Sequence, residues 1–388
     1  MQGESGEKLR KKISDNAALL HLIDFGTNQV FNSATTYTCI IFLSRDRKNS
    51  FTYKKYDLGE DIWTIDTCEK LTIDEEFTKA KEGWNFSNLE ISGLLNKIRN
   101  AGRSFEERTH RIFKGSSTGN DKIFLLDILE EKDNTVLVKS DIKTEPFEIE
   151  KNICRPFIYG EDVLRFSIPV TRKLLLFPYT KVSGKYRLYS INELATYYPL
   201  ALSYLNEFKE LLLSRKTRLT EDSFFKYSAA RSLNEYEQFK ILIPDMLVNC
   251  RVGLDPYGVF FTGPAIHCPV FKDEVNQYAY FAILNSCLFW FYISHTSTAL
   301  RGNAYRLTPE FLNDFSFPEL DIKVEKALES LVKNILQLNS EHRCDATSKL
   351  ENSIDRIIYE LYGLTNAEVK LIDPDEVIIG ADDEFFEA

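Results

Sequence analysis

Apolar residues recur along this chain at two spacings, one typical of helices and the other typical of strands. The helical pattern predicts helices over residues 7–18, 88–100, 197–220, 278–295, 322–340 and 345–363. Short β-branched and aromatic runs predict strands over residues 21–25, 37–43, 135–139, 174–177, 186–189, 241–244 and 258–261. The run at 37–43 is continuous, which is typical of a strand buried on both faces.

The C-terminal segment has the most regular pattern. Four apolar residues fall at i, i+3, i+4 and i+7 and form one helical stripe: Ile354, Ile357, Ile358 and Leu361. Gly363 is placed to end that helix, and Thr365 with Glu368 is typical of a capping box that starts a further short helix. The whole pattern predicts a mixed α+β fold: the edge of an α/β sheet, then a mixed α/β region, then an antiparallel helix pair.

Charge is distributed unevenly along the chain. The 388 residues carry a net charge of −10. Residues 321–388 hold 16 acidic and 7 basic side chains, whereas residues 1–320 hold 42 acidic and 41 basic ones. A near-neutral body with local basic patches is compatible with nucleic-acid binding, although the total charge gives no support for it.

Cysteine, histidine and apolar residues argue against several other classes of protein. The seven cysteines are scattered without a C-x-x-C pair, which indicates unpaired thiols in a reducing, cytoplasmic compartment, and Cys39 and Cys287 are interpreted as small buried residues. The five histidines are dispersed, so no metal site is expected. The longest apolar run, residues 281–293, is interrupted and too short to span a membrane. No apolar signal segment follows the basic residues 8–12, so no export is expected.

Residues 114–122 form the most distinctive polar segment of the chain. Their sequence is Lys-Gly-Ser-Ser-Thr-Gly-Asn-Asp-Lys, and they lie between apolar runs that end at Phe113 and begin at Ile123. Two glycines, small hydroxyl residues and an Asn-Asp pair predict a tight loop between two strands. A lysine at each end would place positive charge beside exposed backbone N–H groups, an arrangement that suits a phosphate. An ordinary polar hairpin is the alternative interpretation.

Further basic and aromatic residues gather in residues 209–226, at Arg231 and in residues 301–306. Arginine suits base edges because its planar fork can make two parallel hydrogen bonds to guanine, whereas lysine mostly positions phosphates. Residues 300–306 combine charge, an aromatic ring and a glycine directly after a very apolar helix, as recognition loops often do. The alternative is a solvated face whose charges pair within the protein.

Short segments along almost the whole chain follow one another in a recognisable order. They are Asp24-Phe25-Gly26, Gln29-Val30-Phe31 and Ala34-Thr35-Thr36-Tyr37; then residues 114–122, Arg155-Pro156, 162–166 and 177–179; then residues 204–205, 211–215, 240–244 and 282–286; then Arg301-Gly302-Asn303, Tyr305-Arg306 and residues 354–365. In this order they resemble gamma-class adenine-N6 DNA methyltransferases, especially those of type IIG restriction–modification enzymes. The first group resembles the last catalytic segment of that family, and the second resembles the start of a TaqI-like target-recognition domain. The final helix resembles the terminal helix of these enzymes.

The resemblance implies a division into three parts and a partner. Residues 1–60 would be a remnant of the catalytic domain, residues 61–320 the DNA target-recognition domain, and residues 321–388 a helical segment with an acidic tail. The partner would be double-stranded DNA. Phe31 would offer a stacking surface to a flipped adenine, with a core phenylalanine as the alternative. The candidate DNA contacts are Lys114, Ser117, Thr118, Asn120, Lys122, Arg155, Arg165, Tyr179, Arg215, Lys226, Arg231, Arg301, Asn303, Tyr305 and Arg306.

The two chemical motifs of the family are absent from this sequence. Its 17 glycines form no G-x-G, and its 12 prolines include no adjacent pair, so the S-adenosylmethionine loop and the Asn/Asp-Pro-Pro-Tyr/Phe motif are both missing. In family order these motifs would precede residue 1. The chain is therefore expected to be a DNA-reading fragment with no catalytic residue and no bound S-adenosylmethionine. Two alternatives stay open: half of a split methyltransferase completed by a separate N-terminal half, and a protein-interaction module without DNA contact.

Overall fold

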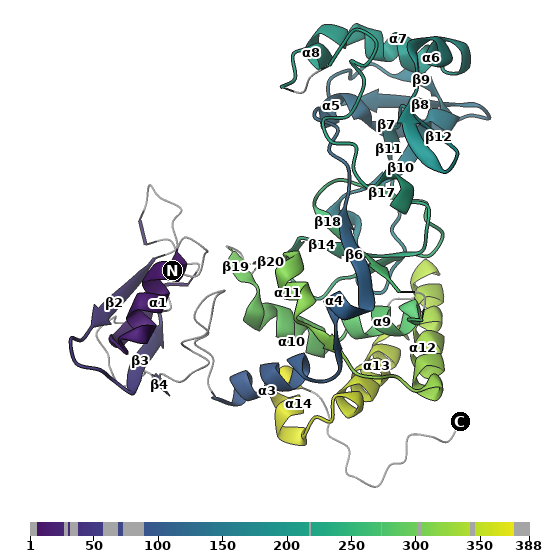
Figure 1. Ribbon diagram of the computed structural model, residues 1–388. Coiled ribbons are helices and arrows are strands. Elements are labelled where there is room, and N and C mark those ends of the chain that lie inside the picture. The colour runs from purple at the N-terminus through teal and green to yellow at the C-terminus, as the bar shows by residue number, and fades with distance from the viewer. Residues whose placement is uncertain are drawn as a thin grey trace.

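Three hydrophobic clusters organise the protein. The computed structural model describes residues 6–26, 30–31, 38–56, 69–72, 89–216, 219–272, 274–300, 304–341 and 346–375. Figure 1 shows a small N-terminal sheet, an upper lobe built on a larger sheet, and a lower body rich in helices. A narrow waist joins the lobe to the body. The predicted mixed α+β class is confirmed.

The N-terminal part consists of one helix and one sheet. Helix α1 (Glu7–Asp15) precedes strands β1 (Leu19–Asp24), β2 (Cys39–Leu43), β3 (Ser50–Lys55) and β4 (Glu69–Thr72), in the order β2-β1-β3-β4. Strand β1 runs parallel to β3 and antiparallel to β2. The prediction that β2 is buried on both faces is wrong, because β2 is an edge strand and Ile40, Phe42 and Leu43 are exposed by 36%, 37% and 55%.

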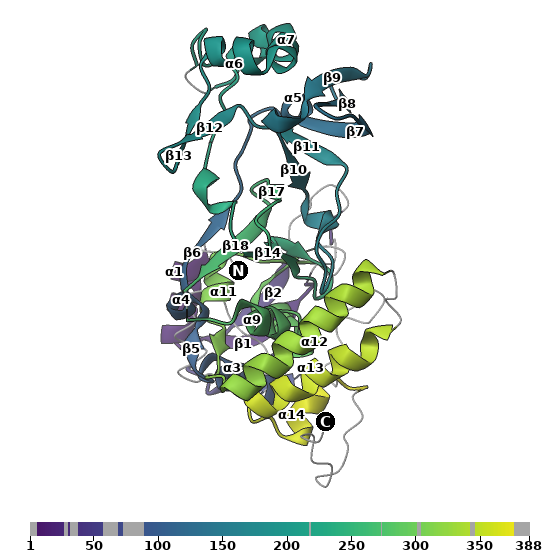
Figure 2. The same cartoon turned by 90° about the vertical axis from the view of Figure 1, so that its right-hand side faces the viewer.

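The upper lobe is a six-stranded sheet covered by short helices. Its order is β17 (Phe261–Thr262), β10 (Cys154–Ile158), β11 (Lys173–Leu176), β7 (Leu125–Glu131), β8 (Thr135–Ser140) and β9 (Phe147–Glu150). Helices α5 (Asp121–Phe124), α6 (Ile191–Tyr197), α7 (Pro199–Glu207) and α8 (Lys209–Leu213) contribute to its core. A separate hairpin of β12 (Tyr179–Val182) and β13 (Lys185–Leu188) projects from the lobe (Figure 2).

The single helix predicted over residues 197–220 is two short helices, α7 and α8, which directly follow α6. Pro199 occupies the first turn of α7, and the residue before a proline avoids the helical conformation. Tyr198 accordingly has φ −141° and ψ 58°, which ends α6. Phe208, with φ −112° and ψ 15°, separates α7 from α8.

The lower body packs helices against a four-stranded antiparallel sheet. The sheet order is β16 (Gly253–Asp255), β14 (Lys240–Pro244), β18 (Ile266–Phe271) and β6 (Thr109–Lys114). The helices are α3 (Leu89–Arg99), α9 (Gln277–Leu284), α10 (Cys287–Thr296), α12 (Ile322–Ser340), α13 (Ser348–Leu361) and α14 (Asn366–Ile372). Smaller elements are β5 (Arg103–Ser104), α4 (Phe105–Arg108), β15 (Met246–Leu247), β19 (Thr298–Leu300), β20 (Ala304–Arg306), α11 (Pro309–Asn313) and β21 (Ser316–Phe317).

The apolar segment 278–295 forms two helices instead of the one predicted. Asn285 interrupts it, because its side-chain amide donates to Val252 O at 3.0 Å and its Oδ1 accepts the Val252 N–H at 3.0 Å. Ser286 then caps α10 by accepting the Phe289 N–H. The break between α9 and α10 therefore coincides with a polar side chain that is bonded to the residue before β16.

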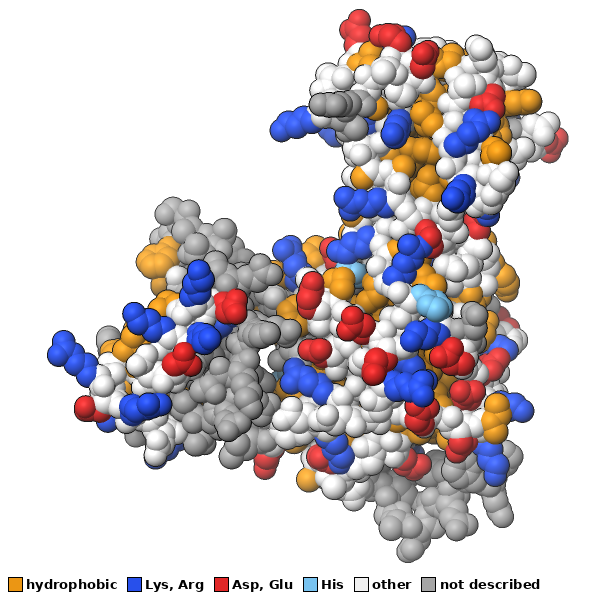
Figure 3. Space-filling model, in the orientation of Figure 1, with side chains coloured by type: hydrophobic (Ala, Val, Ile, Leu, Met, Phe, Trp, Pro, Cys, Tyr) orange, Lys and Arg blue, Asp and Glu red, His pale blue; other side chains and the backbone are white. Residues whose placement is uncertain are grey.

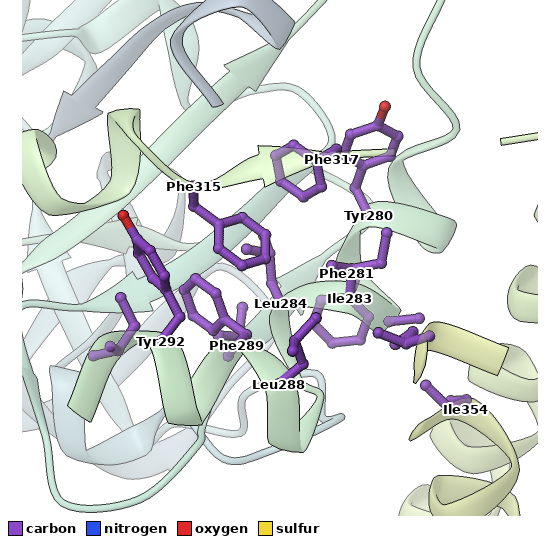
Figure 4. Close-up of a cluster of buried hydrophobic side chains, with 14 of the residues drawn as sticks. Tyr280, Phe281, Ile283, Leu284, Leu288, Phe289, Tyr292, Phe315, Phe317 and Ile354 are labelled. Atoms are coloured by element: carbon purple, nitrogen blue, oxygen red, sulfur yellow. The ribbon is translucent and has the colours of Figure 1, made fainter. Parts of the chain in front are cut away.

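The C-terminal helices belong to the same hydrophobic core as the rest of the lower body. Figure 4 shows Ile354 of α13 in the same buried cluster as Phe281, Phe289 and Phe315. Residues of the apolar segment 278–292 belong to this core, and so does the stripe at 354–361, in which Ile354 and Ile358 are fully buried. The capping box at Thr365 and Glu368 is also present.

His267 of β18 is a buried histidine with a strongly perturbed pKa. The side chain is fully buried, and its Nε2 lies 3.1 Å from Leu307 O. Burial, and then the nearby charge of Lys114, lowers its pKa from 6.5 to about 4, against the smaller opposite effects of Leu307 O and Glu310. The folded state therefore keeps the imidazole neutral in a pH range where the unfolded chain protonates it.

Replacing Ile358 by alanine tests whether α13 is part of the core. Because the side chain is fully buried, we expect the free energy of unfolding to fall by about 2–5 kcal/mol. The same substitution at Ile322, which is 63% exposed at the start of α12, should change it by less than about 0.5 kcal/mol. Chemical denaturation of the full chain measures both. Equal, small losses would show that α13 is peripheral.

His267→Gln should make the free energy of unfolding less dependent on pH on the acid side. In the wild type, stability contributed by the neutral imidazole is complete above pH 6.5 and is lost as the pH falls toward about 4. The shift corresponds to at most roughly 3 kcal/mol. Thermal melts of both proteins between these pH values give the difference. Parallel loss in wild type and variant would contradict a depressed pKa at this position.

Candidate nucleic-acid interface

The polar segment 114–122 connects the two larger parts of the protein. Strand β6, which precedes it, pairs with β18 in the lower sheet, whereas β7, which follows it, pairs with β11 and β8 in the upper sheet. The alternative interpretation of an ordinary hairpin is therefore wrong, because β6 and β7 do not pair with each other and belong to different sheets. A short helix, α5, comes between the loop and β7.

The backbone amides of this loop are largely bonded within the protein. The N–H of Ser116 donates to the Tyr236 hydroxyl at 3.1 Å, that of Ser117 to Ala229 O at 3.0 Å, and that of Asn120 to Thr118 Oγ1 at 3.1 Å. The predicted phosphate cradle of exposed N–H groups is therefore wrong for these three residues. Gly115 is required by a close approach, since a Cβ there would lie 1.9 Å from Thr262 O.

A second segment, residues 226–231, pairs with the loop, and we call residues 114–120 and 226–231 together the braced loop. Ser117 and Ala229 exchange two backbone hydrogen bonds of 3.0 Å, and Ser228 N donates to Thr118 O at 3.2 Å. Arg215 reinforces this pairing. Its Nη1 donates to Thr118 O at 2.6 Å, and its Nη2 donates to Phe224 O and Lys226 O. Arg215 is therefore a structural brace, not the free DNA contact that was predicted.

The braced loop and the adjacent α5 present a group of unpaired cations. Lys122, Lys226 and Arg231 are exposed, and none of these three forms an ion pair with an acidic group among the described residues. Lys114, at the end of β6, is half-buried. Figure 3 shows Lys and Arg side chains gathered at the waist. Uncompensated cations held on a rigid backbone suit a phosphate backbone.

A three-stranded sheet, β15-β20-β19, lies next to Lys114. Arg306 is exposed, and the charges of Lys114 and Arg306 both act to lower the pKa of Asp245, although burial is stronger and raises it. The ring of Tyr305 packs edge-on against Trp290 at 5.5 Å. The fold thus brings Lys114 together with Tyr305 and Arg306. Arg301 and Asn303 lie outside the described residues.

Three other predicted DNA contacts have internal roles. Tyr179 is 4% exposed, and its hydroxyl accepts the Tyr227 N–H at 2.9 Å. Arg155 donates to Asn152 O and Cys154 O at 2.8 and 2.9 Å. Thr118 is 3% exposed. Tyr179 and Thr118 are therefore corrected from surface contacts to buried structural residues, whereas the half-buried Arg155 stays a predicted contact.

Arg165 also serves the interior. Its Nε and Nη2 donate to Asn285 O at 3.0 and 2.7 Å, and its Nη1 pairs with Glu351 of α13 at 2.5 Å. This links the loop after β10 to the break between α9 and α10 and to the C-terminal helices. The prediction of a DNA contact at Arg165 is therefore also corrected.

The remaining predicted residues keep their status as predictions. Phe31 exposes 54% of its surface, which suits a stacking role but does not test it. Ser117 and Asn120 are half-buried within the braced loop. In the described part of the chain, no group of His, Cys, Asp or Glu residues could hold a metal ion. No described helix has the length and apolar character needed to cross a membrane.

Sequence reasoning missed the residues that hold the waist together. The Tyr236 hydroxyl donates to Thr262 O at 2.9 Å while accepting from Ser116, and its ring stacks on Phe261 at 4.2 Å. Lys240 and Asp255 form a fully buried ion pair. A lysine directly before the apolar run 241–244 was a usable signal for a buried charge, whereas nothing distinguished Tyr236 from the other 18 tyrosines.

Comparison with known proteins places this geometry in a family context. Residues 155–316 match the TaqI-like C-terminal specificity domain. The chain is 23% identical to the Type II restriction enzyme and methyltransferase RM.Eco57I of Escherichia coli, over 92% of this chain and 37% of that protein. It is 22% identical to the Type II methyltransferase M.BstVI of Geobacillus stearothermophilus, over 95% of this chain and 63% of that protein.

The fold supports the same relationship. It matches that of the Type IIL restriction-modification enzyme MmeI, solved in complex with DNA, with a TM-score of 0.58 and 15% identity over 96% of this chain and 47% of that one. The chain thus spans less than two thirds of the length of each of these proteins. Along most of its length the chain is similar to type II restriction–modification methyltransferases, and residues 155–316 match the TaqI-like C-terminal specificity domain.

Proposed function

We propose that this chain is the sequence-reading part of an adenine-specific DNA methyltransferase of the restriction–modification kind. One observation carries this proposal. Residues 155–316, which match the specificity domain, include Lys226 and Arg231, two exposed cations of the braced loop. DNA-binding proteins commonly position the duplex through phosphate contacts and read sequence through base edges. The braced loop suits the first task, because its backbone is fixed before binding.

The second task, base reading, would fall to side chains that reach the surface from a regular strand. Tyr305 and Arg306 stand on a three-stranded sheet beside Lys114. Arginine can make two parallel hydrogen bonds to guanine in the major groove. Arg306 is therefore the described residue that best fits base recognition in this proposal, with Lys114 as a neighbouring phosphate contact.

The proposal assigns no S-adenosylmethionine site to the described N-terminal residues. Asp24, at the end of β1, already accepts the Gly26 N–H at 2.8 Å and the Tyr53 hydroxyl at 3.3 Å, so its carboxylate is engaged inside the protein. The sequence also has no G-x-G loop and no Pro-Pro pair. In this proposal the chain therefore chooses a site on DNA and does not transfer a methyl group by itself.

A split methyltransferase is the second candidate function. Strand β2 is an edge strand with three exposed apolar side chains, Ile40, Phe42 and Leu43. Such an edge favours a complementing partner over solvent, and a separate methyltransferase half would supply one. The third candidate, an interaction module based on the C-terminal helices, has less support, since α12 and α13 bury their apolar stripes within the lower body.

Loss of two cations from the braced loop tests DNA binding directly. For Lys226→Ala/Arg231→Ala, we expect fluorescence anisotropy with a random-site duplex pool to show about tenfold weaker binding at low salt and a salt slope reduced by about 2. The control is Lys132→Ala/Lys151→Ala, which removes two ion-paired cations from the β7–β8 turn and the end of β9 in the upper sheet. Flat, negligible binding by the wild type at low salt would reject the proposal.

Isothermal titration with S-adenosylmethionine tests the missing cofactor site. The full chain should give no heat of binding up to millimolar cofactor, because its sequence contains neither a G-x-G loop nor a Pro-Pro pair. Saturable binding in the micromolar range would show instead that a cofactor site exists in residues 1–388.

A further inference from the structure

The β12–β13 hairpin is a rigid two-stranded ribbon whose two faces differ. In its register Tyr179 pairs with Leu188, Thr180 with Arg187, Lys181 with Tyr186, and Val182 with Lys185. Directly opposite residues of an antiparallel pair lie on the same face, and faces alternate along each strand. One face therefore carries Tyr179, Lys181, Tyr186 and Leu188, and the other carries Thr180, Val182, Lys185 and Arg187.

The first face anchors the ribbon to the protein. Tyr186 donates its hydroxyl to Glu237 and its N–H to Asn234 Oδ1 at 3.3 Å, and Lys181 pairs with Glu237 at 2.5 Å. The Tyr179 hydroxyl accepts the Tyr227 N–H from the lobe core. Because these bonds hold the base, the direction in which the tip points is fixed.

The second face and the tip are open to solvent. Val182, Lys185 and Arg187 are exposed, and no atom lies within 4 Å of a Cβ built on Gly184. Ser183 and Gly184 both have positive φ, 48° and 78°, which suits the tight two-residue turn that matches strand twist. Figure 2 shows the hairpin projecting away from the upper lobe.

The ribbon carries only positive charge. Residues 179–188 contain Lys181, Lys185 and Arg187 and no carboxylate. Lys181 is neutralised by Glu237, and Arg187 by Glu193 of α6 at 2.5 Å. Lys185 has no ion pair among the described residues, so the uncompensated charge of the ribbon lies at its tip.

One short segment connects the ribbon to the braced loop. Arg231 N donates to Ser116 Oγ at 3.1 Å, and three residues later Asn234 accepts from the ribbon. Glu237 accepts from the ribbon a further three residues along. The ribbon and the braced loop are therefore fastened to opposite ends of residues 231–237 and form one rigid unit at the waist.

We infer that the tip of the β12–β13 ribbon is a second DNA-contacting element, in which Lys185 contacts a phosphate of the duplex held by the braced loop. The inference rests on the proposed function and extends it to a surface that contains none of the residues discussed there. A two-stranded ribbon has the width of the major groove, and an unpaired lysine at its tip complements phosphate charge. A protein partner would instead favour the apolar tip residue Val182.

Lys185→Ala and Lys185→Glu test this inference in the full chain. For Lys185→Ala, anisotropy with a random-site duplex pool should show binding weakened by about two- to tenfold at low salt, with a salt slope smaller by about 1. Lys185→Glu should weaken binding further, because it repels phosphate. The matched control is Lys139→Ala in β8, which removes an equally exposed lysine without an ion pair among the described residues of the same lobe. Thermal melts should be unchanged in all three variants, since both lysines are exposed.

The outcomes separate the two proposals. Wild-type affinity in Lys185→Ala and Lys185→Glu, alongside weak binding by Lys226→Ala/Arg231→Ala, would overturn the inference and leave the proposed function standing. Equal losses in Lys185→Ala and Lys139→Ala would also overturn it, because only total charge would then matter. If the wild type binds no duplex at low salt, the proposed function fails and the inference fails with it.

Discussion

The passage of the chain between two separate hydrophobic cores is the constraint on which the rest of the structure depends. At the waist, backbone groups leave one sheet and enter another, and each buried N–H or carbonyl must find a partner on the way. The Tyr236 hydroxyl accepts the Ser116 N–H and donates to Thr262 O. These two groups belong to two different segments that pass between the sheets, one between β6 and β7 and the other between β17 and β18. Without such a bridge, two backbone groups in a buried region would lose hydrogen bonds, at a cost of about 1–3 kcal/mol each.

The buried Lys240–Asp255 ion pair also satisfies polar groups at the waist. Lys240 also donates to Tyr236 O at 2.8 Å, so the ion pair is attached to the residue that bridges the crossings. Asp255 accepts the N–H groups of Val259 and Phe260 at 3.1 and 2.8 Å and thereby shapes the loop before β17. Breaking a buried pair by removing one partner typically costs about 3–5 kcal/mol, because a charge is left without compensation. The pair therefore supplies a fixed geometry at the waist, which is what a recognition surface requires.

Sequence patterns predicted the elements better than their connections. The helices α12, α13 and α14 follow from apolar stripes and a capping box, which are local signals. The strand predicted at 258–261 is only Phe261–Thr262 in the structure. The backbone amides just before it donate to the Asp255 carboxylate, and Gly258 adopts φ +67°, so these residues cannot pair as a strand. Residues 114–122 were predicted to be a tight loop between two strands, with an ordinary hairpin as the alternative, because their local composition is that of a turn. Only the distant partners of β6 and β7, residues 266–271 and 173–176, determine that it crosses between sheets.

The candidate interface shows the same division between local and distant causes. Residue type predicted that lysines and arginines would matter, but it could not separate Arg215, whose guanidinium donates to four carbonyl groups, from Arg231, whose side chain is exposed. Both are arginines in basic, aromatic-rich sequence, and only their surroundings differ. The same holds for net charge: a total of −10 argues against DNA, yet acidic residues such as Glu193, Glu237 and Glu351 are committed to partners within the fold. Local charge therefore says more than the total, and Lys122, Lys226 and Arg231 form no ion pair among the described residues.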